Sequence, residues 1–74
     1  MPPKFKDLKK YCEKNGWILL PNTDHWYYEK VLIDGTVLRT KVSHATHKEI
    51  PAHLWQLILT KQLQITNSEF WANI

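Results

Sequence analysis

The chain has four histidines, the side chains best suited to move a proton near neutral pH, and they are His25, His44, His47 and His53. His25 follows the turn-forming residues Asn22-Thr23-Asp24 and precedes the aromatic run Trp26-Tyr27-Tyr28. A histidine at the start of a strand keeps access to solvent. In RNA cleavage it can take the proton of a ribose 2′-OH or protonate the leaving oxygen. A histidine that only hydrogen-bonds its own loop is the structural alternative.

Other chemistries find less support. Ser43 adjoins His44, but no acid is spaced to complete a nucleophilic triad. His44-x-x-His47 offers two metal ligands and Glu49 a third. Because this spacing is common by chance, we expect no metal and no other cofactor. The single cysteine, Cys12, excludes an intramolecular disulfide and a zinc knuckle.

Length and charge place bounds on the function. The 74 residues are enough for one domain, 1–74, and 43% of them are hydrophobic. The net charge is +3, and residues 1–16 account for it through an excess of lysines. These lysines form either a solvated helix face or part of a surface for a polyanion. No signal-like leader or membrane span is visible, so we expect a cytoplasmic protein without membrane contact.

Periodicity predicts a helix at each end of the chain. Phe5, Leu8 and Cys12 recur at helical spacing, and Asn15-Gly16 is a typical helix stop. A second helix is predicted to start at Ile50-Pro51 and to continue to Leu63. The remaining elements are a short strand over 17–20 and, after the capping box Thr66-Asn67-Ser68-Glu69, a last helical turn.

Asp34-Gly35 between two β-prone runs predicts a hairpin of His25–Ile33 with Thr36–His44. Centring the turn there makes paired residue numbers sum to 69, so that Tyr28 faces Lys41 and His25 faces His44. Alternation then predicts two faces. The predicted core face carries His25, Tyr27, Val31, Ile33, Leu38, Val42 and His44, and the predicted solvent face carries Trp26, Tyr28, Lys30, Leu32, Val37, Arg39 and Lys41.

The predicted element order is α-β-β-β-α. It indicates an α+β fold in which both helices cover one face of a three-stranded antiparallel sheet. Double-stranded-RNA-binding domains share this order, a likeness of fold alone.

The predicted solvent face combines aromatic rings with cations. Rings and cations so interleaved suit stacked bases and phosphates, and the lysine-rich first helix would add to that surface. Ordinary cross-strand pairing and a covering protein partner are the alternatives. The candidate RNA-binding residues are Lys9, Lys10, Trp26, Tyr28, Lys30, Arg39 and Lys41.

Nearly the whole chain resembles the HicA toxin family, small ribonucleases of bacterial toxin–antitoxin modules. "FKDLKKYCEKNGW" is similar to the opening helix of that family, and "NTDH" stands where the family has a Gly-Ser turn before its catalytic histidine. "VSHATHKEIPAHLWQLILTKQLQI" resembles the strand-end histidine, the acidic-Ile loop and the closing helix. Asn22 and Thr23 replace the usual Gly-Ser.

The resemblance implies a metal-independent endoribonuclease that cleaves mRNA and is covered by a HicB-like antitoxin. It assigns catalysis to His25 and a supporting role to His44. Two other functions stay open: a catalytically inactive RNA-binding module, and a protein-interaction domain that uses Trp26, Tyr28 and Trp71. The RNA preference and the oligomeric state do not follow from the sequence.

Overall fold

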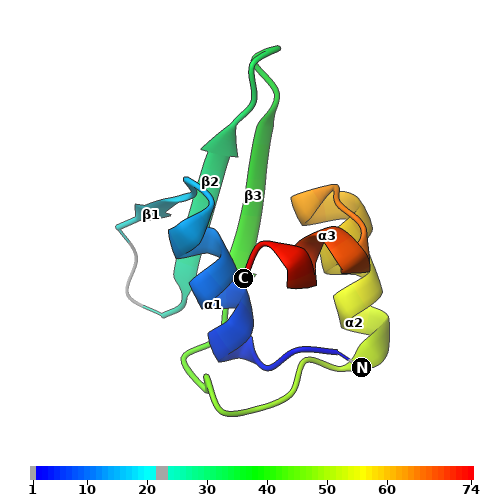
Figure 1. The fold of residues 1–74 in the computed structure, drawn as a ribbon. Coiled ribbons are helices and arrows are strands. Elements are labelled where there is room, and N and C mark those ends of the chain that lie inside the picture. The colour runs from blue at the N-terminus through cyan, green and yellow to red at the C-terminus, as the bar shows by residue number, and fades with distance from the viewer. Residues whose placement is uncertain (1, 22–23) are drawn as a thin grey trace.

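The computed structural model describes residues 2–21 and 24–74. Asn22 and Thr23, which begin the predicted turn, lie outside these ranges. The predicted α-β-β-β-α order is confirmed, and the last helical turn predicted after the capping box is a short helix at the C-terminal end (Figure 1). The elements are α1 (Phe5–Lys14), β1 (Ile18–Leu20), β2 (Trp26–Val31), β3 (Val37–Val42), α2 (Ala52–Leu57), η1 (Ile58–Leu63) and α3 (Asn67–Ala72).

Helix α1 forms because its apolar residues share one face. Leu8, Tyr11 and Cys12 are buried, whereas lysines occupy the exposed positions. The backbone N–H of Lys4 donates to the Asp7 carboxylate (2.9 Å), which closes the N-terminal turn. The helix ends at Lys14, and Gly16 follows with a φ of 78°, a conformation that glycine adopts without a steric penalty.

The sheet has the order β1-β2-β3 and is antiparallel throughout. Between β2 and β3 the predicted register is wrong by one residue, because Tyr28 pairs with Thr40 and Tyr27 pairs with Lys41. A three-residue loop causes this shift. The Leu32 N–H donates to the Thr36 carbonyl (2.8 Å), and Gly35, with φ of 90°, donates to the Leu32 carbonyl (3.0 Å). A turn followed by a left-handed glycine is the usual three-residue hairpin loop.

The register shift reverses the two faces of β2, because neighbouring strand residues point to opposite sides. Tyr28, predicted to face solvent, is 2% exposed on the helix-covered face, whereas Val31, predicted to be core, is 60% exposed. The predicted faces of β3 are correct: Leu38 and Val42 are buried and Arg39 is exposed. The reversal also moves Trp26 and Lys30 to the covered face and Tyr27 to the open one.

Both helical segments lie on the same face of the sheet, as predicted. The Tyr28 hydroxyl lies 3.4 Å from Glu13 of α1, and the hydroxyl of its strand neighbour Thr40 donates to Gln62 of η1 (2.7 Å). Figure 1 shows the helices beside the sheet. A single core of side chains fills the space between these layers. Its buried apolar residues are Leu8, Tyr11, Cys12, Trp17, Tyr28, Leu38, Val42, Ile50, Trp55, Ile58, Leu59, Leu63 and Phe70.

The second predicted helix is confirmed, but its latter half is a π-helix, η1. It ends at Gln64, whose φ of 56° and ψ of 46° are left-handed and whose N–H bonds the Leu59 carbonyl. The predicted capping box opens α3, since the Thr66 hydroxyl accepts from the Glu69 N–H (3.1 Å). Within residues 2–21 and 24–74, no helix is long and apolar enough to cross a membrane.

We expect Gln64→Gly to raise the free energy of unfolding by about 0.5–1 kcal/mol, because a side chain in the left-handed region clashes with its own backbone. The change corresponds to a rise in Tm of a few °C, about 4–8 °C per kcal/mol in a chain of this size. Gln64→Ala is the matched control, since it keeps Cβ and the strain. A Tm of Gln64→Gly that is no higher than the Tm of Gln64→Ala would contradict the strained, left-handed conformation of Gln64.

Burial raises the pKa of the Cys12 thiol from near 9 to about 12, and the Glu13 carboxylate adds to the effect. In the unfolded chain the thiol ionises near pH 8.5, at about its ordinary value. Stability from this group is therefore complete below pH 8.5 and falls as the pH rises toward 12, by up to about 1.4 kcal/mol per pH unit. We expect denaturant titrations between pH 8.5 and 11 to show this loss of stability. In Cys12→Ala the free energy of unfolding should fall less steeply with pH. If the free energy of unfolding of Cys12→Ala falls with pH as steeply as that of the wild type, ionisable groups other than Cys12 cause the loss.

Candidate functional site

His25 lies at the end of the sheet, immediately before β2. Its side chain is 35% exposed, and Nδ1 lies 3.8 Å from Oδ2 of Asp24, close enough for an ion pair when the imidazole is protonated. Nδ1 is buried and has no hydrogen-bond partner among the described residues. The exposed part of the ring is therefore away from Nδ1, which makes Nε2 the nitrogen available to a ligand. A carboxylate beside one imidazole nitrogen can orient the ring and stabilise its protonated form.

His44 comes close to His25, as predicted, although the pairing that predicted it is wrong. Their ring centroids are 6.2 Å apart. In the observed register His25 would stand opposite Ser43, so the two imidazoles meet diagonally across the strand ends. His44 is exposed and also lies against Trp26, with ring centroids 4.4 Å apart. The indole thus forms one wall beside the two histidines.

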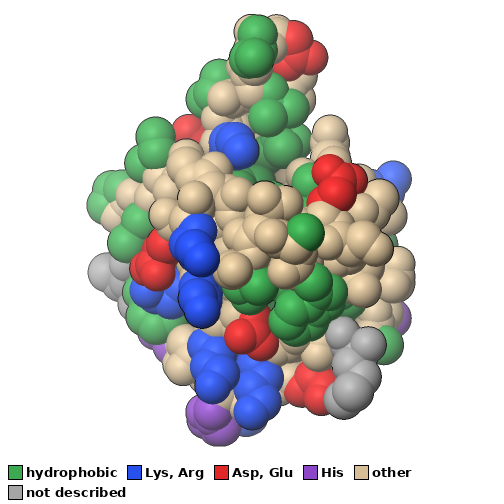
Figure 2. Space-filling view, in the orientation of Figure 1, with side chains coloured by type: hydrophobic (Ala, Val, Ile, Leu, Met, Phe, Trp, Pro, Cys, Tyr) green, Lys and Arg blue, Asp and Glu red, His purple; other side chains and the backbone are tan. Residues whose placement is uncertain are grey.

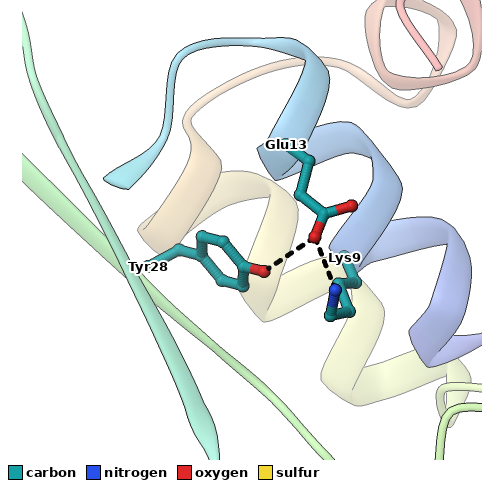
Figure 3. Close-up of polar contacts among 3 residues, drawn as sticks. All are labelled: Lys9, Glu13 and Tyr28. Carbon is teal, nitrogen blue, oxygen red and sulfur yellow. Dashed lines mark hydrogen bonds and ion pairs between the residues drawn. The ribbon is translucent and has the colours of Figure 1, made fainter. Parts of the chain in front are cut away.

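On the helix side, Trp26 also contacts Lys9, whose ammonium lies 5.0 Å from the indole centroid. Figure 3 shows the Glu13 carboxylate accepting from both Lys9 and Tyr28. The hydrogen bond to Glu13 raises the pKa of Lys9, and burial raises that of Tyr28. Lys9 is therefore already partnered, and its predicted role as a free phosphate ligand is weakened.

The predicted aromatic and basic face does not exist as one surface. Trp26, Tyr28 and Lys30 lie on the helix-covered side, whereas Arg39 and Lys41 lie on the open side. Because Tyr28 is only 2% exposed, it cannot stack on a base. The predicted RNA-binding set is thus divided between two faces.

The exposed positive charge gathers instead along α1. Figure 2 shows basic side chains (blue) over this helix and on below it, with histidine (purple) at the lower end of the same side. Lys6, Lys10 and Lys14 are exposed there. The N-terminus of α1 is joined to the loop after β3 by hydrogen bonds from Phe5 and Lys6, so the basic helix adjoins the segment that carries His44.

Two residues near His25 were not assigned to the site from the sequence. Asp24 was predicted only as turn material, and Tyr27 was predicted as core. Tyr27 is half-buried on the open face, with its ring edge-to-face to His25 and centroids 6.3 Å apart. The correct hairpin register would have placed Tyr27 outside, but the Asp-Gly signal does not distinguish a three-residue loop from a two-residue one.

A metal centre finds no support among the described residues, which contain no group of three or more His, Cys, Asp or Glu side chains placed around one point. His44 is engaged with aromatic rings, and the two ligands proposed with it, His47 and Glu49, are exposed in the following loop. The site that the fold assembles is therefore a pair of imidazoles with an adjacent carboxylate, at the junction of the open sheet face and the basic helix.

Comparisons with family models, curated proteins and solved structures give no match to this chain. The chain is a small α+β domain with a three-stranded antiparallel sheet.

Proposed function

We propose that this chain is a HicA-like endoribonuclease that cleaves mRNA without a metal ion, with His25 as the group that transfers the proton. The observation that carries the proposal is the position of the His25 imidazole. It is partly exposed, it has a carboxylate 3.8 Å from Nδ1, and a second imidazole lies 6.2 Å away. This is the histidine to which the HicA resemblance assigns catalysis. A HicB-like antitoxin is the proposed protein partner.

The proposed reaction is a transfer within the ribose phosphate backbone. His25 Nε2 takes the proton of the 2′-OH, and the 2′-oxygen then bonds to the adjacent phosphorus. The P–O5′ bond breaks, the leaving oxygen takes up a proton from water, and the His25 imidazolium returns its proton to the solvent. The products are a 2′,3′-cyclic phosphate and a 5′-hydroxyl. His44, which is exposed beside His25, supports the reaction by contacting the phosphate, and Asp24 holds the His25 ring as its imidazolium forms.

RNA reaches this site along the basic side of the molecule. Lys6, Lys10 and Lys14 are exposed on α1, and none of them forms an ion pair within the described part of the chain. Ammonium groups in such a row bind successive phosphates without regard to sequence. The helix thus supplies affinity, whereas the histidines supply chemistry.

The open sheet face supports a second candidate function, a protein-interaction domain. Ile18, Val31 and Val37 share this face and are 65%, 60% and 48% exposed. Exposed apolar groups on one sheet face are typical of a surface that another protein covers. Trp26 and Tyr28, first expected to form that surface, lie on the other side of the sheet and do not contribute to it.

We expect His25→Ala to lower the rate of RNA cleavage by about 10²–10⁴-fold, the usual loss when a general acid or base is removed. The fold should persist, because a partly exposed residue at the start of a strand adds little to the core. The measurement is cleavage of an end-labelled RNA by purified protein, alongside growth arrest on induced expression. His44→Ala should lose less activity than His25→Ala, and Asp24→Asn should fall between wild type and His25→Ala.

His53→Ala is the matched control, because it removes an exposed histidine from α2 that is not part of the site. An RNA whose cleavage position lacks the 2′-OH should not be cut by any variant. Folded His25→Ala protein that cleaves as fast as His53→Ala would refute the role of His25 in proton transfer, whereas RNA binding without cleavage by the wild-type chain would leave an RNA-binding module.

RNA affinity should fall steeply as salt is added, because each neutralised phosphate releases bound cations. Lys10→Ala should reduce the slope of log affinity against log salt by about 0.7, the value for one contact with single-stranded nucleic acid. Lys61→Ala, an exposed lysine in η1, is the control and should leave the slope unchanged. Binding that ignores salt, or an absence of RNA binding at low salt, would favour the protein-interaction function.

A further inference from the structure

Tyr27 is the one aromatic ring of the open sheet face within the described residues, and the surrounding row of side chains is suited to a nucleic-acid base. In the observed register Leu20 of β1 and Lys41 of β3 flank Tyr27 on the same face. Leu20 and Tyr27 are half-buried and Lys41 is exposed. With strands about 4.8 Å apart, the row is about 10 Å wide, which matches a base and its phosphate.

The charges on this face leave one cation available beside the ring. Arg39 Nε donates to the Glu29 carboxylate (2.8 Å), and this pair occupies the next row along the strands. Lys41 has no carboxylate within ion-pair distance among residues 2–21 and 24–74. An aromatic ring next to an unpaired ammonium can hold a base by stacking and its phosphate by charge.

The Tyr27 ring lies close enough to His25 for one nucleotide to contact both side chains. Tyr27 and His25 are two residues apart in the sequence, and their rings meet edge-to-face with centroids 6.3 Å apart. A single nucleotide spans such a distance. A base stacked on Tyr27 therefore brings its ribose beside the imidazole.

We propose that Tyr27 is a stacking platform for one base of single-stranded RNA, with Lys41 holding the phosphate of the same nucleotide. The inference rests on the proposed function for its RNA substrate, and it adds a requirement for an unpaired base. Bases in a duplex are stacked on one another and cannot lie on the ring, so single strands are the substrate. Duplex RNA, which the likeness to double-stranded-RNA-binding domains would favour, is excluded from this platform.

The test uses the purified chain and a probe that cannot be cleaved, a short oligonucleotide with 2′-O-methyl riboses, as a single strand and as a duplex. Affinity is measured by fluorescence anisotropy. We expect the single strand to bind more tightly than the duplex. Tyr27→Ala should weaken single-strand binding by about 5- to 150-fold, the range for loss of one stacked base. Tyr27→Phe should bind as wild type does, because it keeps the ring.

Val37→Ala is the matched control, a truncation on the same face at the far end of β3. It should bind as wild type does. If Tyr27→Ala fails to fold, Tyr27→Leu replaces it, since leucine keeps the apolar bulk and removes the ring. Equal affinity of wild type and the folded Ala or Leu variant, or duplex binding as tight as single-strand binding, would overturn the proposal.

Because the probe cannot react, the outcome is separate from catalysis. Loss of binding in Tyr27→Ala together with no RNA cleavage by the wild-type chain would retain the platform and reject the ribonuclease. Cleavage that depends on His25, together with unchanged binding in Tyr27→Ala, would retain the ribonuclease and reject the platform.

Discussion

The three-residue loop between β2 and β3 is the constraint on which the rest of the molecule depends. Its two hydrogen bonds, from Leu32 to Thr36 and from Gly35 to Leu32, set which residues of the hairpin face each other. In a sheet whose two faces differ in burial, a shift of one residue exchanges the interior and exterior sets of a strand. The loop therefore places Tyr28 in the core and Tyr27 beside the candidate site.

Tyr28 then joins the sheet to the first helix. Its ring is buried between the layers, and its hydroxyl lies near the Glu13 carboxylate, which also accepts from Lys9. Lys9 and Glu13 are partly exposed, so their ion pair adds little to stability by itself. Its effect is positional, since it keeps the Lys9 ammonium over Trp26, and Trp26 in turn packs against His44. Three side chains thus connect the buried Tyr28 ring to His44 of the candidate site: Glu13, Lys9 and Trp26.

The two sides of the sheet consequently differ in what they can bind. The basic side along α1 is suited to a phosphate backbone and adjoins His44, whereas the open face carries Tyr27, Lys41 and exposed aliphatic groups. His25, at the end of the sheet, is accessible where these two surfaces meet. A ligand that follows both surfaces must pass the pair of imidazoles. This arrangement is the physical basis for the proposals on RNA.

Local signals were sufficient for the elements themselves. Apolar spacing in α1, the glycine after it and the Thr66–Glu69 capping box all act within one or two turns of chain, and each was predicted correctly. The element order followed as well, whereas the closeness of His25 to His44 was predicted from a direct pairing that the observed register excludes. The hairpin register did not follow, because Asp34-Gly35 suits loops of two, three or four residues. The three-residue loop is the one that buries the Tyr28 ring against the helices, and that packing depends on residues far apart in the sequence. The divided basic surface and the position of the Tyr27 ring on the open face follow from that non-local choice.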